Sequence, residues 1–324
     1  MESIQPQMRF IDQVFQEIDL ASIHPILAST TLYALNTGGK RLRPLILALC
    51  AELVGGRYQD AKEVILALEL IHNATLVHDD ILDEDTYRRG KPALYVAEGV
   101  KKAVLTGDAL LSLGLKHAAR TENPQVVHWL ASTSLKMIEG ISIQNQYKRR
   151  LMSVEEYLQM NYLKSGSLFE AAGALGALAG SGNQEDVDRL AAFGRMFGNA
   201  YQIHDDILDA FNEGGTNGKP NNDLINGDPS LLFLIAVKSP KIQREDRERL
   251  LSVFQGRSRE LDIGFAARVY QDSGALAMAI GKMKEFLREA RAIIEAYPDG
   301  EASRSLLGLL DQYDKERVED FLSP

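Results

Sequence analysis

One acidic hexapeptide, HDDILD, occurs twice in this chain, at His78–Asp83 and at His204–Asp209. Each copy places carboxylates at positions i, i+1 and i+4, so on a helix the first and third share a face and the second is rotated by roughly 100°. Three like charges this close repel one another unless a cation lies between them. Oxygen ligands on a helical face suit a hard divalent ion that keeps waters and is completed by a substrate phosphate, as Mg²⁺ does. The repeat therefore predicts two metal-binding faces that hold one polyanion.

Two features distinguish this repeat from an ordinary acidic helix surface. A single DDxxD is also typical of a solvated helix face or of a first helical turn, where Asp is common. Here an Asn-Ala pair begins five positions before each histidine, at Asn73-Ala74 and Asn199-Ala200, so the two copies agree at eight of eleven places. Both copies also lie in apolar sequence, at 67–71 and 193–203, which favours a cavity wall over a solvated surface.

Basic clusters could bind the phosphate groups that the acidic motifs imply. Gly38–Pro44 reads GGKRLRP and leads into an apolar helix, and free N–H groups and cations at such a junction form an anion site. In Thr86–Pro92, two adjacent arginines suit forked phosphate contacts. A third cluster surrounds Lys164. Each could be solvated lysine and arginine when taken alone, but two acidic helices in the same chain weaken that reading. The polar, glycine-rich segment 213–223 is interpreted as a mobile lid over the site.

Composition bounds the remaining possibilities. The 324 residues are 45% hydrophobic and 25% charged, as in ordinary globular proteins, and the net charge of −9 argues against nucleic-acid binding. The lone Cys50 lies in the apolar run 45–51, which excludes an intrachain disulfide and favours a buried thiol. Residues 1–10 lack a signal-peptide pattern, and no apolar stretch reaches the roughly 20 residues that cross a bilayer. We therefore expect a cytoplasmic protein without a transmembrane segment.

Apolar residues recur at helical spacing along almost the whole chain, and the alternation typical of strands is missing. The pattern predicts an all-α protein, and the lack of a long linker favours one domain over residues 1–324. Gly173, Gly176 and Gly180 would let helices approach closely. The predicted helices span residues 9–20, 26–36, an apolar helix that ends at 54, 61–85, a helix that follows 105–111 and stops before 122, 125–147, 154–180, 184–211, and several more from 230 to 321.

The order of these motifs resembles that of the trans-isoprenyl diphosphate synthases, the head-to-tail prenyltransferases. The resemblance covers nearly the whole chain, and several ordered motifs make it specific. They are Gly38–Pro44, His72, Asp79–Asp83, Arg88–Pro92, Gly107-Asp108, Lys164-Ser165, Gln202, Asp205–Asp209, Gly218–Pro220 and Asp223-Leu224.

The resemblance implies a bundle of long helices around a deep central cavity, usually as a homodimer. It implies that Asp79, Asp83 and Asp205 hold three Mg²⁺ ions per active site against an allylic diphosphate, supported directly or through water by Asp80, Asp206 and Asp209. It further assigns Arg88, Lys164 and Lys219 to that diphosphate, Lys40, Arg43, His72 and Arg89 to isopentenyl diphosphate, and Ser165 and Gln202 to the carbocation.

The implied chemistry is ionisation, condensation and elimination. Breaking an allylic C–O bond separates diphosphate from a carbocation, and metal ions with cationic side chains stabilise the departing charge. The double bond of isopentenyl diphosphate attacks the cation, and a proton then leaves to the released diphosphate. No protein nucleophile is needed, in keeping with the absence of an evident triad. Two departures from the family pattern are Ser165 in place of Thr, and Ser230-Leu231-Leu232 in place of Thr-Leu-Pro.

Product length is expected to depend on bulk upstream of the first motif. Ala74 and Thr75 stand five and four positions before Asp79, and neither is aromatic. One helical turn rises about 5.4 Å, close to one isoprene unit, so the missing plug should permit elongation past C15. We expect a product of C20 or longer, with C25 to C40 favoured. Small residues at a helix packing contact are the alternative explanation, and would leave farnesyl diphosphate synthase open.

Two other functions compete with this one. A class I terpene cyclase shares the helical cavity and one DDxxD, but its second metal site is normally an Asn/Asp-Ser/Thr-Glu pattern, and Gly38–Pro44 would have no second diphosphate to bind. A non-catalytic partner subunit would bind Mg²⁺ without turnover, and the retained basic clusters argue against it. For the synthase, a long prenyl tail would make product release slow and dependent on peripheral contact with a membrane or detergent.

Overall fold

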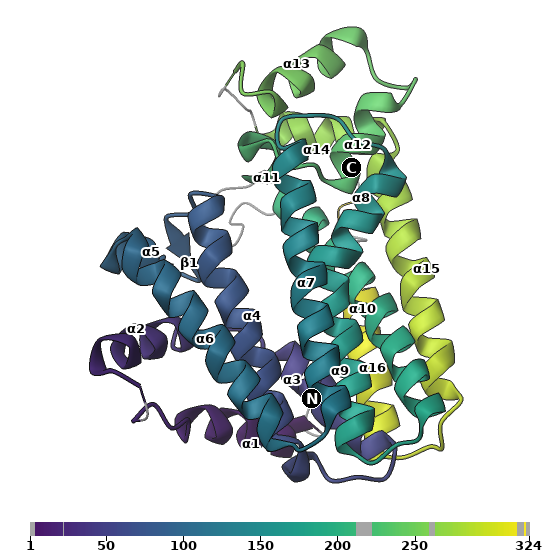
Figure 1. The fold of residues 1–324 in the computed structure, drawn as a ribbon. Coiled ribbons are helices and arrows are strands. Elements are labelled where there is room, and N and C mark those ends of the chain that lie inside the picture. The colour runs from purple at the N-terminus through teal and green to yellow at the C-terminus, as the bar shows by residue number, and fades with distance from the viewer. Residues whose placement is uncertain (1–3, 22, 212–221, 259–262, 316–320, 322–324) are drawn as a thin grey trace. The chain divides into compact units, whose positions relative to one another are not determined.

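The computed structural model describes residues 4–21, 23–211, 222–258, 263–315 and 321, and these residues are almost entirely helical (Figure 1). The predicted all-α class is confirmed. Contacts divide the chain into two compact units. Unit 1 comprises Met1–Met137, Ser167–Gly194 and Ala292–Gly308, and unit 2 comprises Ile138–Gly166, Arg195–Arg291 and Leu309–Pro324. The expectation of a single domain stays a prediction.

The helices fall into three groups with respect to these units. Unit 1 contains α1 (Gln5–Gln16), α2 (Pro25–Leu35), α3 (Leu42–Leu53), the short 3₁₀-helix η2 (Tyr58–Ala61), α4 (Lys62–Leu82), α5 (Leu94–Glu98), α6 (Val100–Arg120) and α9 (Ser167–Ala179). Unit 2 contains α8 (Val154–Asn161), the π-helix η3 (Tyr162–Gly166), α11 (Asn222–Asn226), α12 (Leu231–Lys238), α13 (Arg244–Phe254) and α14 (Ile263–Asp272). Residues of both units occur in α7 (Pro124–Tyr147), α10 (Gln184–Phe211), α15 (Ala275–Glu295) and α16 (Glu301–Lys315).

In unit 1, α4 packs along α6, and α3 packs along α9 (Figure 1). Close approach depends on glycine at both contacts. A Cβ on Gly114 of α6 would lie 2.8 Å from the Ile71 side chain of α4. A Cβ on Gly176 of α9 would lie 2.5 Å from the Leu47 carbonyl oxygen of α3, and one on Gly180 would lie 2.4 Å from that of Ala51. The predicted role of Gly176 and Gly180 in close helix packing is confirmed.

A two-residue hairpin was not expected from the sequence. Strands β1 (Tyr87–Arg88) and β2 (Lys91–Pro92) pair antiparallel, with Tyr87 opposite Pro92 and Arg88 opposite Lys91. The turn residues Arg89 and Gly90 have φ of 52° and 79°, so both are left-handed, as a tight hairpin turn requires. The hairpin therefore puts Arg88 in a strand and Arg89 in the turn.

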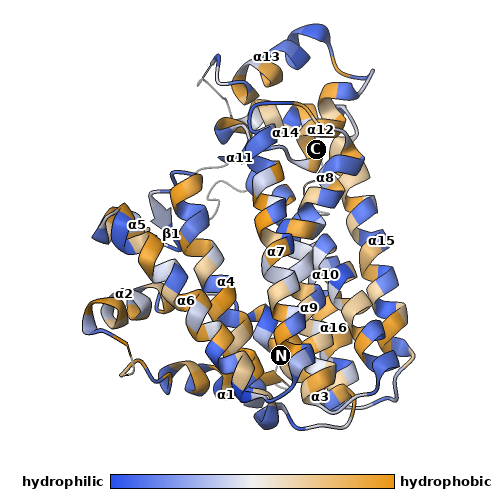
Figure 2. Ribbon diagram, in the orientation of Figure 1, coloured by the Kyte–Doolittle hydropathy of each residue, from blue (hydrophilic) through white to orange (hydrophobic). Residues whose placement is uncertain are grey.

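In unit 2, caps and apolar faces define the helix starts. The Ser153 side chain accepts a hydrogen bond from the Glu156 amide, and the Glu156 carboxylate accepts one from the Ser153 amide, which is a capping box before α8. Ser230 likewise caps α12 by accepting from the Phe233 amide. The apolar residues of α12 are visible in Figure 2 and are mostly buried. A helix therefore still begins here, although Ser230-Leu231-Leu232 differs from the Thr-Leu-Pro of the family pattern.

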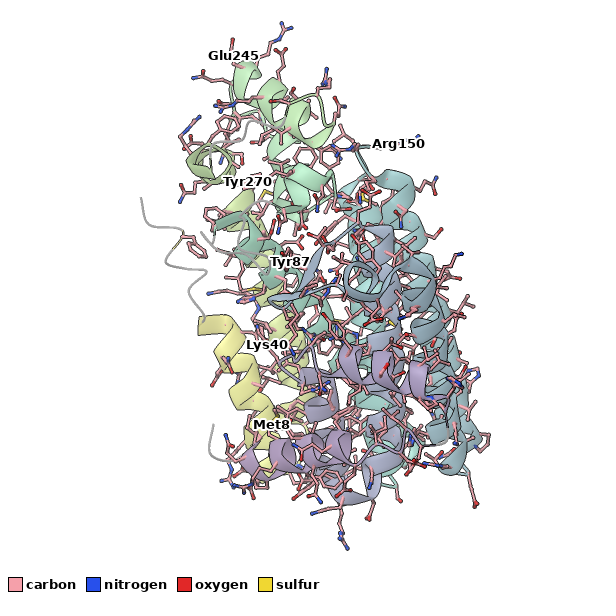
Figure 3. The ribbon with its side chains drawn as sticks, turned by 90° about the vertical axis from the view of Figure 1, so that its left-hand side faces the viewer. Met8, Lys40, Tyr87, Arg150, Glu245 and Tyr270 are labelled. Atoms are coloured by element: carbon pink, nitrogen blue, oxygen red, sulfur yellow. The ribbon has the colours of Figure 1, made fainter. Side chains whose placement is uncertain are left out.

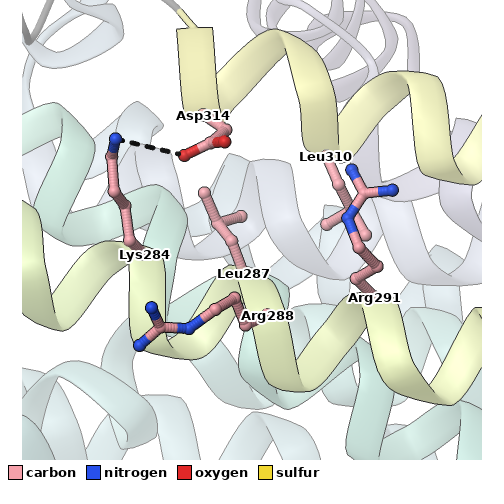
Figure 4. Close-up of a pocket in the computed structure, with 6 residues that line it drawn as sticks. All are labelled: Lys284, Leu287, Arg288, Arg291, Leu310 and Asp314. Atoms are coloured by element: carbon pink, nitrogen blue, oxygen red, sulfur yellow. Dashed lines mark ion pairs between the residues drawn. The ribbon is translucent and has the colours of Figure 1, made fainter.

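Ion pairs join α15 to α16 within unit 2, and Figure 4 shows the pair of Lys284 with Asp314. Lys284 Nζ lies 3.7 Å from Asp314 Oδ1, and Arg291 forms a shorter pair with Asp311. A surface pocket here contains none of the predicted site residues. It is lined by Lys284, Leu287, Arg288, Arg291, Leu310 and Asp314.

Three predicted helix boundaries were wrong. The first helix spans 5–16 rather than 9–20, because Pro6 lies in its first turn and starts it early. Helix α6 begins at Val100 and includes the Gly107-Asp108 pair, which the sequence had placed before a helix. The predicted helix 154–180 is divided by η3. Among the described residues, no helix has the length and apolar character needed to span a bilayer.

Candidate active site

The first acidic motif lies at the C-terminal end of α4, in unit 1. Asp79 and Asp83 are half-buried and one turn apart, and the Asp83 amide donates to the Asp79 carbonyl oxygen at 2.8 Å. Asp83 ends the helix as its C-cap residue. The spacing predicted from the sequence is therefore present, with these two carboxylates on one side of α4.

Asp80, the second acid of the motif, is buried and bound to Arg88. Arg88 Nε donates to Asp80 Oδ1 at 2.7 Å, and Nη2 donates to the same oxygen over a shorter distance. Burial raises the pKa of Asp80, and the contact with Arg88 opposes that rise. Nη1 takes no part in these two hydrogen bonds. Asp80 therefore orients the guanidinium without using all of its donors.

Arginines gather around one imidazole on the same unit. His72 is 8% exposed, and Arg43 Nη1 donates to its Nε2 at 3.2 Å. Burial, followed by the positive charges of Arg43, Arg89, Arg88 and Arg41, lowers the pKa of His72 well below its usual range. The ring is therefore neutral, and the network assigns its proton to Nδ1. Four arginine side chains thus lie near one neutral imidazole, a setting suited to an anion.

The glycine turn before α3 receives the second arginine of the hairpin. The Arg89 guanidinium donates to the Gly38 carbonyl oxygen, and a Cβ on Gly39 would lie 2.6 Å from Arg89 Nη1. Burial lowers the pKa of Arg89, and the positive charges of the neighbouring arginines lower it further. Lys40 follows in the same turn and is exposed (Figure 3). The structure thus brings together the hairpin and the glycine turn, as the predicted phosphate site requires.

Arg41 and Glu69 are structural members of this cluster that the sequence reasoning missed. Arg41 Nη1 lies 2.6 Å from Glu69 Oε1, and both side chains are nearly buried, at 11% and 5% exposure. The Arg41 guanidinium also stacks on the Phe15 ring at 4.4 Å. A signal existed, because Glu69 is the single charge in an apolar run, and a buried charge needs a partner.

In unit 2, the π-helix η3 presents Lys164 and Ser165. A Cβ on Gly140 of α7 would lie 2.4 Å from the Lys164 backbone nitrogen, so only glycine permits this contact. On the other side, a Cβ on Gly166 would lie 2.7 Å from Asn199 Oδ1 of α10. The segment is therefore clamped between α7 and α10, and π-turns of this kind are frequent at functional sites.

Each of these two side chains begins a hydrogen-bond chain through a glutamine. Lys164 Nζ donates to Gln144 Oε1 at 2.5 Å, and Gln144 Nε2 donates to Asp228 Oδ1 at 2.9 Å. Ser165 Oγ donates to Gln202 Oε1 at 2.8 Å, and Gln202 Nε2 donates to the second motif's Asp206 at 3.1 Å. The predicted residues Lys164, Ser165 and Gln202 are thereby brought together.

Asp206 is fixed by protein donors rather than left accessible. It accepts from the Tyr157 hydroxyl at 2.5 Å and from the Leu231 amide at 3.3 Å, and it is 5% exposed. Burial raises its pKa to about 6, although these hydrogen bonds and the charge of Lys164 oppose the rise. Tyr157 was missed in the sequence, where a lone tyrosine in an amphipathic helix gives no signal.

Asp209 caps the short helix α11. Its two carboxylate oxygens accept from the amides of Asn222 and Asp223, each at 3.2 Å. Burial raises the pKa of Asp209 to about 6, and these amides oppose the rise. Asp205 is half-buried on α10, as Asp79 is on α4. Lys219 and most of the predicted lid lie outside the described residues.

The donor set fits a hard metal ion that is completed by other ligands. Among the described residues, no three His, Cys, Asp or Glu side chains are close enough to hold a metal by themselves. Asp79, Asp83 and Asp205 offer only carboxylate oxygens and are half-buried rather than enclosed. Such donors suit an ion that takes its remaining ligands from water and from a phosphate, which is the usual coordination of Mg²⁺.

Relatives of known activity match nearly the full length of the chain. The short chain isoprenyl diphosphate synthase of Methanothermobacter thermautotrophicus is 32% identical over 321 residues, covering 96% of this chain and 98% of the relative. The geranylfarnesyl diphosphate synthase of Aeropyrum pernix is 35% identical over 315 residues, covering 93% and 98%.

Solved structures match to the same extent. Geranylgeranyl pyrophosphate synthetase from Pyrococcus horikoshii has a TM-score of 0.87 and 30% identity, with 97% of each chain covered. Polyprenyl synthase from Caulobacter crescentus, complexed with calcium and isoprenyl diphosphate, has a TM-score of 0.82 and 28% identity, covering 98% of this chain and 95% of that one. The protein therefore has the isoprenoid synthase fold.

The family model for polyprenyl synthetase matches residues 24–268, more than half of the chain. With the relatives above, this match shows that the chain belongs to the polyprenyl synthetase family. It is a trans-prenyltransferase that makes a prenyl diphosphate, and the resemblance drawn from the sequence is confirmed.

Proposed function

We propose that this prenyltransferase condenses isopentenyl diphosphate with an allylic diphosphate, requires Mg²⁺, and makes an all-trans product of C20 or longer, with C25 to C40 favoured. The observation that carries the proposal is a difference within each acidic motif. Asp79, Asp83 and Asp205 are half-buried, whereas Asp80 and Asp206 are buried against protein donors. In this arrangement Asp79, Asp83 and Asp205 would bind three metal ions. Asp80, Asp206 and the half-buried Asp209, whose oxygens already accept from protein donors, would orient the site.

The departing allylic diphosphate would meet cations from two sources. Mg²⁺, when bound, supplies positive charge to the leaving group. Arg88, oriented by Asp80, and Lys164, held by Gln144, would contact the diphosphate oxygens, with Lys219 as a third contact. Asp206 and Asp209 would support the second metal face through hydrogen bonds already in place.

Isopentenyl diphosphate would bind the arginine cluster. Arg43, Arg89 and Lys40 would contact its diphosphate, and the neutral His72 would donate its Nδ1 proton. The cluster gathers four arginine side chains around His72, while Glu69 pairs with Arg41, and Asp80 and Asp85 pair with Arg88. A diphosphate would bind these guanidinium groups by charge-assisted hydrogen bonds, without a metal ion.

The carbocation would be steadied by Ser165. Because Ser165 Oγ donates its proton to Gln202, its lone pairs are left to face other groups. Both ends of the Gln202 amide are already bonded, so Gln202 would act mainly by fixing that orientation. The hydroxyl would stabilise positive charge without forming a bond to carbon.

Residues before the first motif differ in what they contact. Ala74 is 3% exposed and lies on the side of α4 that carries Ile71 and His78, which approach Gly114 and Gly107 of α6. Thr75 is half-buried one position further round, toward Asp79, and its hydroxyl donates to the His72 carbonyl oxygen at 2.8 Å. A bulky residue at 75 would therefore disturb the packing of α4 less than one at 74.

Replacing Thr75 with Phe is expected to shorten the main product by at least one isoprene unit, because the ring would fill about one helical turn of space. Thr75→Val, which removes the hydroxyl without adding bulk, should keep the wild-type distribution. The measurement is chromatography of dephosphorylated products. An unchanged distribution in folded Thr75→Phe and Ala74→Phe would reject this gating.

A homodimer is proposed from an exposed stripe on α6. Val100, Val104 and Leu115 are 50%, 40% and 40% exposed, and with the half-buried Leu111 they recur at spacings of four, seven and four residues. An apolar seam at this spacing is typical of a helix that packs against another helix. A second copy of this chain presents the same seam and is the occupant we propose.

Light scattering should give a dimer for the wild type, and Leu115→Lys should shift it toward monomer, since burying a lysine in an apolar seam is costly. Leu105→Lys is the matched control, because Leu105 is 57% exposed on the same helix but off the stripe, and it should stay dimeric. A monomeric wild type, or a dimeric Leu115→Lys, would contradict this interface.

The direct test of the reaction uses labelled isopentenyl diphosphate with C5, C10, C15 and C20 allylic primers, with Mg²⁺ and after its removal by EDTA. We expect incorporation only with Mg²⁺, restored by adding it back, and one dominant length beyond C15. Termination at C15 would support a farnesyl diphosphate synthase instead. Stimulation by detergent is expected if a long product leaves slowly.

A further inference from the structure

Gln144 joins the Lys164 ammonium to a buried carboxylate, and no motif in the sequence pointed to it. Its Oε1 accepts from Lys164 Nζ at 2.5 Å, and its Nε2 donates to Asp228 Oδ1 at 2.9 Å. Asp228 is 8% exposed. Gln144 follows Gly140 by four residues on α7, so the residue that admits the π-helix and the residue that receives its lysine share one helix face.

A glutamine side chain suits this place because it accepts and donates at once. The ammonium has only donors and the carboxylate has only acceptors, so a bridge between them needs one acceptor and one donor. A glutamate at 144 would place two carboxylates in contact, and an apolar side chain would leave Asp228 buried without this donor. The uncharged amide thus links opposite charges without adding one.

Asp228 is itself held in a fixed segment. Its amide donates to the Asp223 carbonyl oxygen at 2.8 Å, and the preceding Gly227 carbonyl oxygen accepts from the Arg149 amide at 2.7 Å. Gly227 has φ of 78° and no room for a side chain, since a Cβ would lie 2.5 Å from Arg149 Cγ. The far end of the bridge is therefore anchored in the backbone.

Lys164 has competing acidic partners in the same unit. Its charge acts on Asp206 and Asp223, which also lie near Asp209. A lysine side chain is long and flexible, so its ammonium could be drawn into contact with any of these carboxylates. The bond to Gln144 holds it at one place.

We propose that Gln144, anchored by Asp228, is a positioning residue that holds Lys164 for the allylic diphosphate. This inference rests on the proposed contact between Lys164 and that diphosphate. It adds a residue outside the acidic motifs and the basic clusters, and it assigns Asp228 to orientation of the lysine rather than to metal binding.

The test reverses the direction of the hydrogen bond between positions 144 and 228. Gln144→Glu alone should lower kcat/KM for the allylic substrate by about ten- to hundredfold, because a charge-assisted hydrogen bond is lost and two carboxylates meet. Asp228→Asn alone should have a smaller effect. The double variant Gln144→Glu/Asp228→Asn keeps the total charge and lets the asparagine amide donate to the glutamate, which still accepts from Lys164. It should recover most of the activity.

Gln144→Met removes both polar groups at similar size and is measured with and without Lys164→Ala. Positioning through the lysine predicts that Gln144→Met has little further effect in the Lys164→Ala background. The KM for isopentenyl diphosphate should stay within about twofold of wild type, since that substrate would bind residues of unit 1. Gln146→Met is the matched control, because Gln146 is exposed two residues along α7, and it should behave as wild type.

The outcomes separate the two proposals. If Lys164→Ala leaves the allylic kinetics unchanged, the proposed role of Lys164 fails. If Lys164→Ala is impaired but the Gln144→Met effect is equally large in its presence, or the charge-swapped double variant recovers nothing while thermal melts show it folded, the positioning role of Gln144 is overturned. Should Gln144→Met not fold, the charge-swap set decides alone.

Discussion

Asp79→Asn and Asp205→Asn should each reduce turnover by about a thousandfold or more while the protein stays folded. Asparagine keeps the shape of aspartate but removes the anionic oxygen, and stabilisation of developing charge by a bound metal ion is among the largest contributions to such catalysis. Both side chains are half-buried rather than enclosed in the core, so a replacement of the same shape should leave the packing intact. The measurement is steady-state kinetics with thermal melts of the same samples.

Asp188→Asn is the matched control for this loss. Asp188 lies on α10 with Asp205 but is exposed and bonded only to Gln184 of its own helix among the described contacts. It should retain wild-type kinetics. Raising the Mg²⁺ concentration should restore part of the activity of the two site variants, because a weakened metal site fills at higher concentration. Near-wild-type rates in folded Asp79→Asn and Asp205→Asn would remove the metal assignment.

The second large effect concerns stability. Gly173→Ala should lower the free energy of unfolding by about 3 kcal/mol or more, because the added methyl would lie 1.9 Å from the Leu190 carbonyl oxygen, and only a shift of α9 against α10 relieves that overlap. Both residues belong to unit 1. Denaturant unfolding measures the change.

Gly308→Ala provides the comparison, with the opposite sign. Gly308 lies inside α16, in the same unit, and a Cβ there would meet nothing within 4 Å. Alanine is a better helix former than glycine by up to about 1 kcal/mol, so this variant should be more stable. A Gly173→Ala protein as stable as the wild type would show that α9 and α10 are less closely packed than described.

Much of the fold follows from signals that are local in sequence. The helix predicted at 26–36 is observed at Pro25–Leu35, because a proline marks its start and Asn36 its end. The helix predicted at 184–211 is observed with those bounds. The interruption at 162–166 could not be predicted, since it depends on Gly140 of another helix, and local periodicity does not register such a contact.

The candidate site divides in the same way. Charges that are clustered at a recognisable spacing, such as Asp79 and Asp83, could be found from the sequence because the same acidic motif occurs twice. Tyr157 and Gln144 could not, since each is one polar side chain whose partner lies 49 or 84 residues away. Their roles depend on which helices become neighbours, and that is a property of the folded chain.

The π-helix at Tyr162–Gly166 has a consequence for sequence length. A π-turn contains one residue more than an α-turn, so η3 is equivalent to a single-residue insertion in a helix that would otherwise run on from α8 to α9. Deleting one residue here would let a regular helix form, but it would rotate everything on one side of the deletion by about 100°. Lys164 and Ser165 could not then both keep their glutamine partners. In this region, therefore, the number of residues is constrained as strictly as their identity.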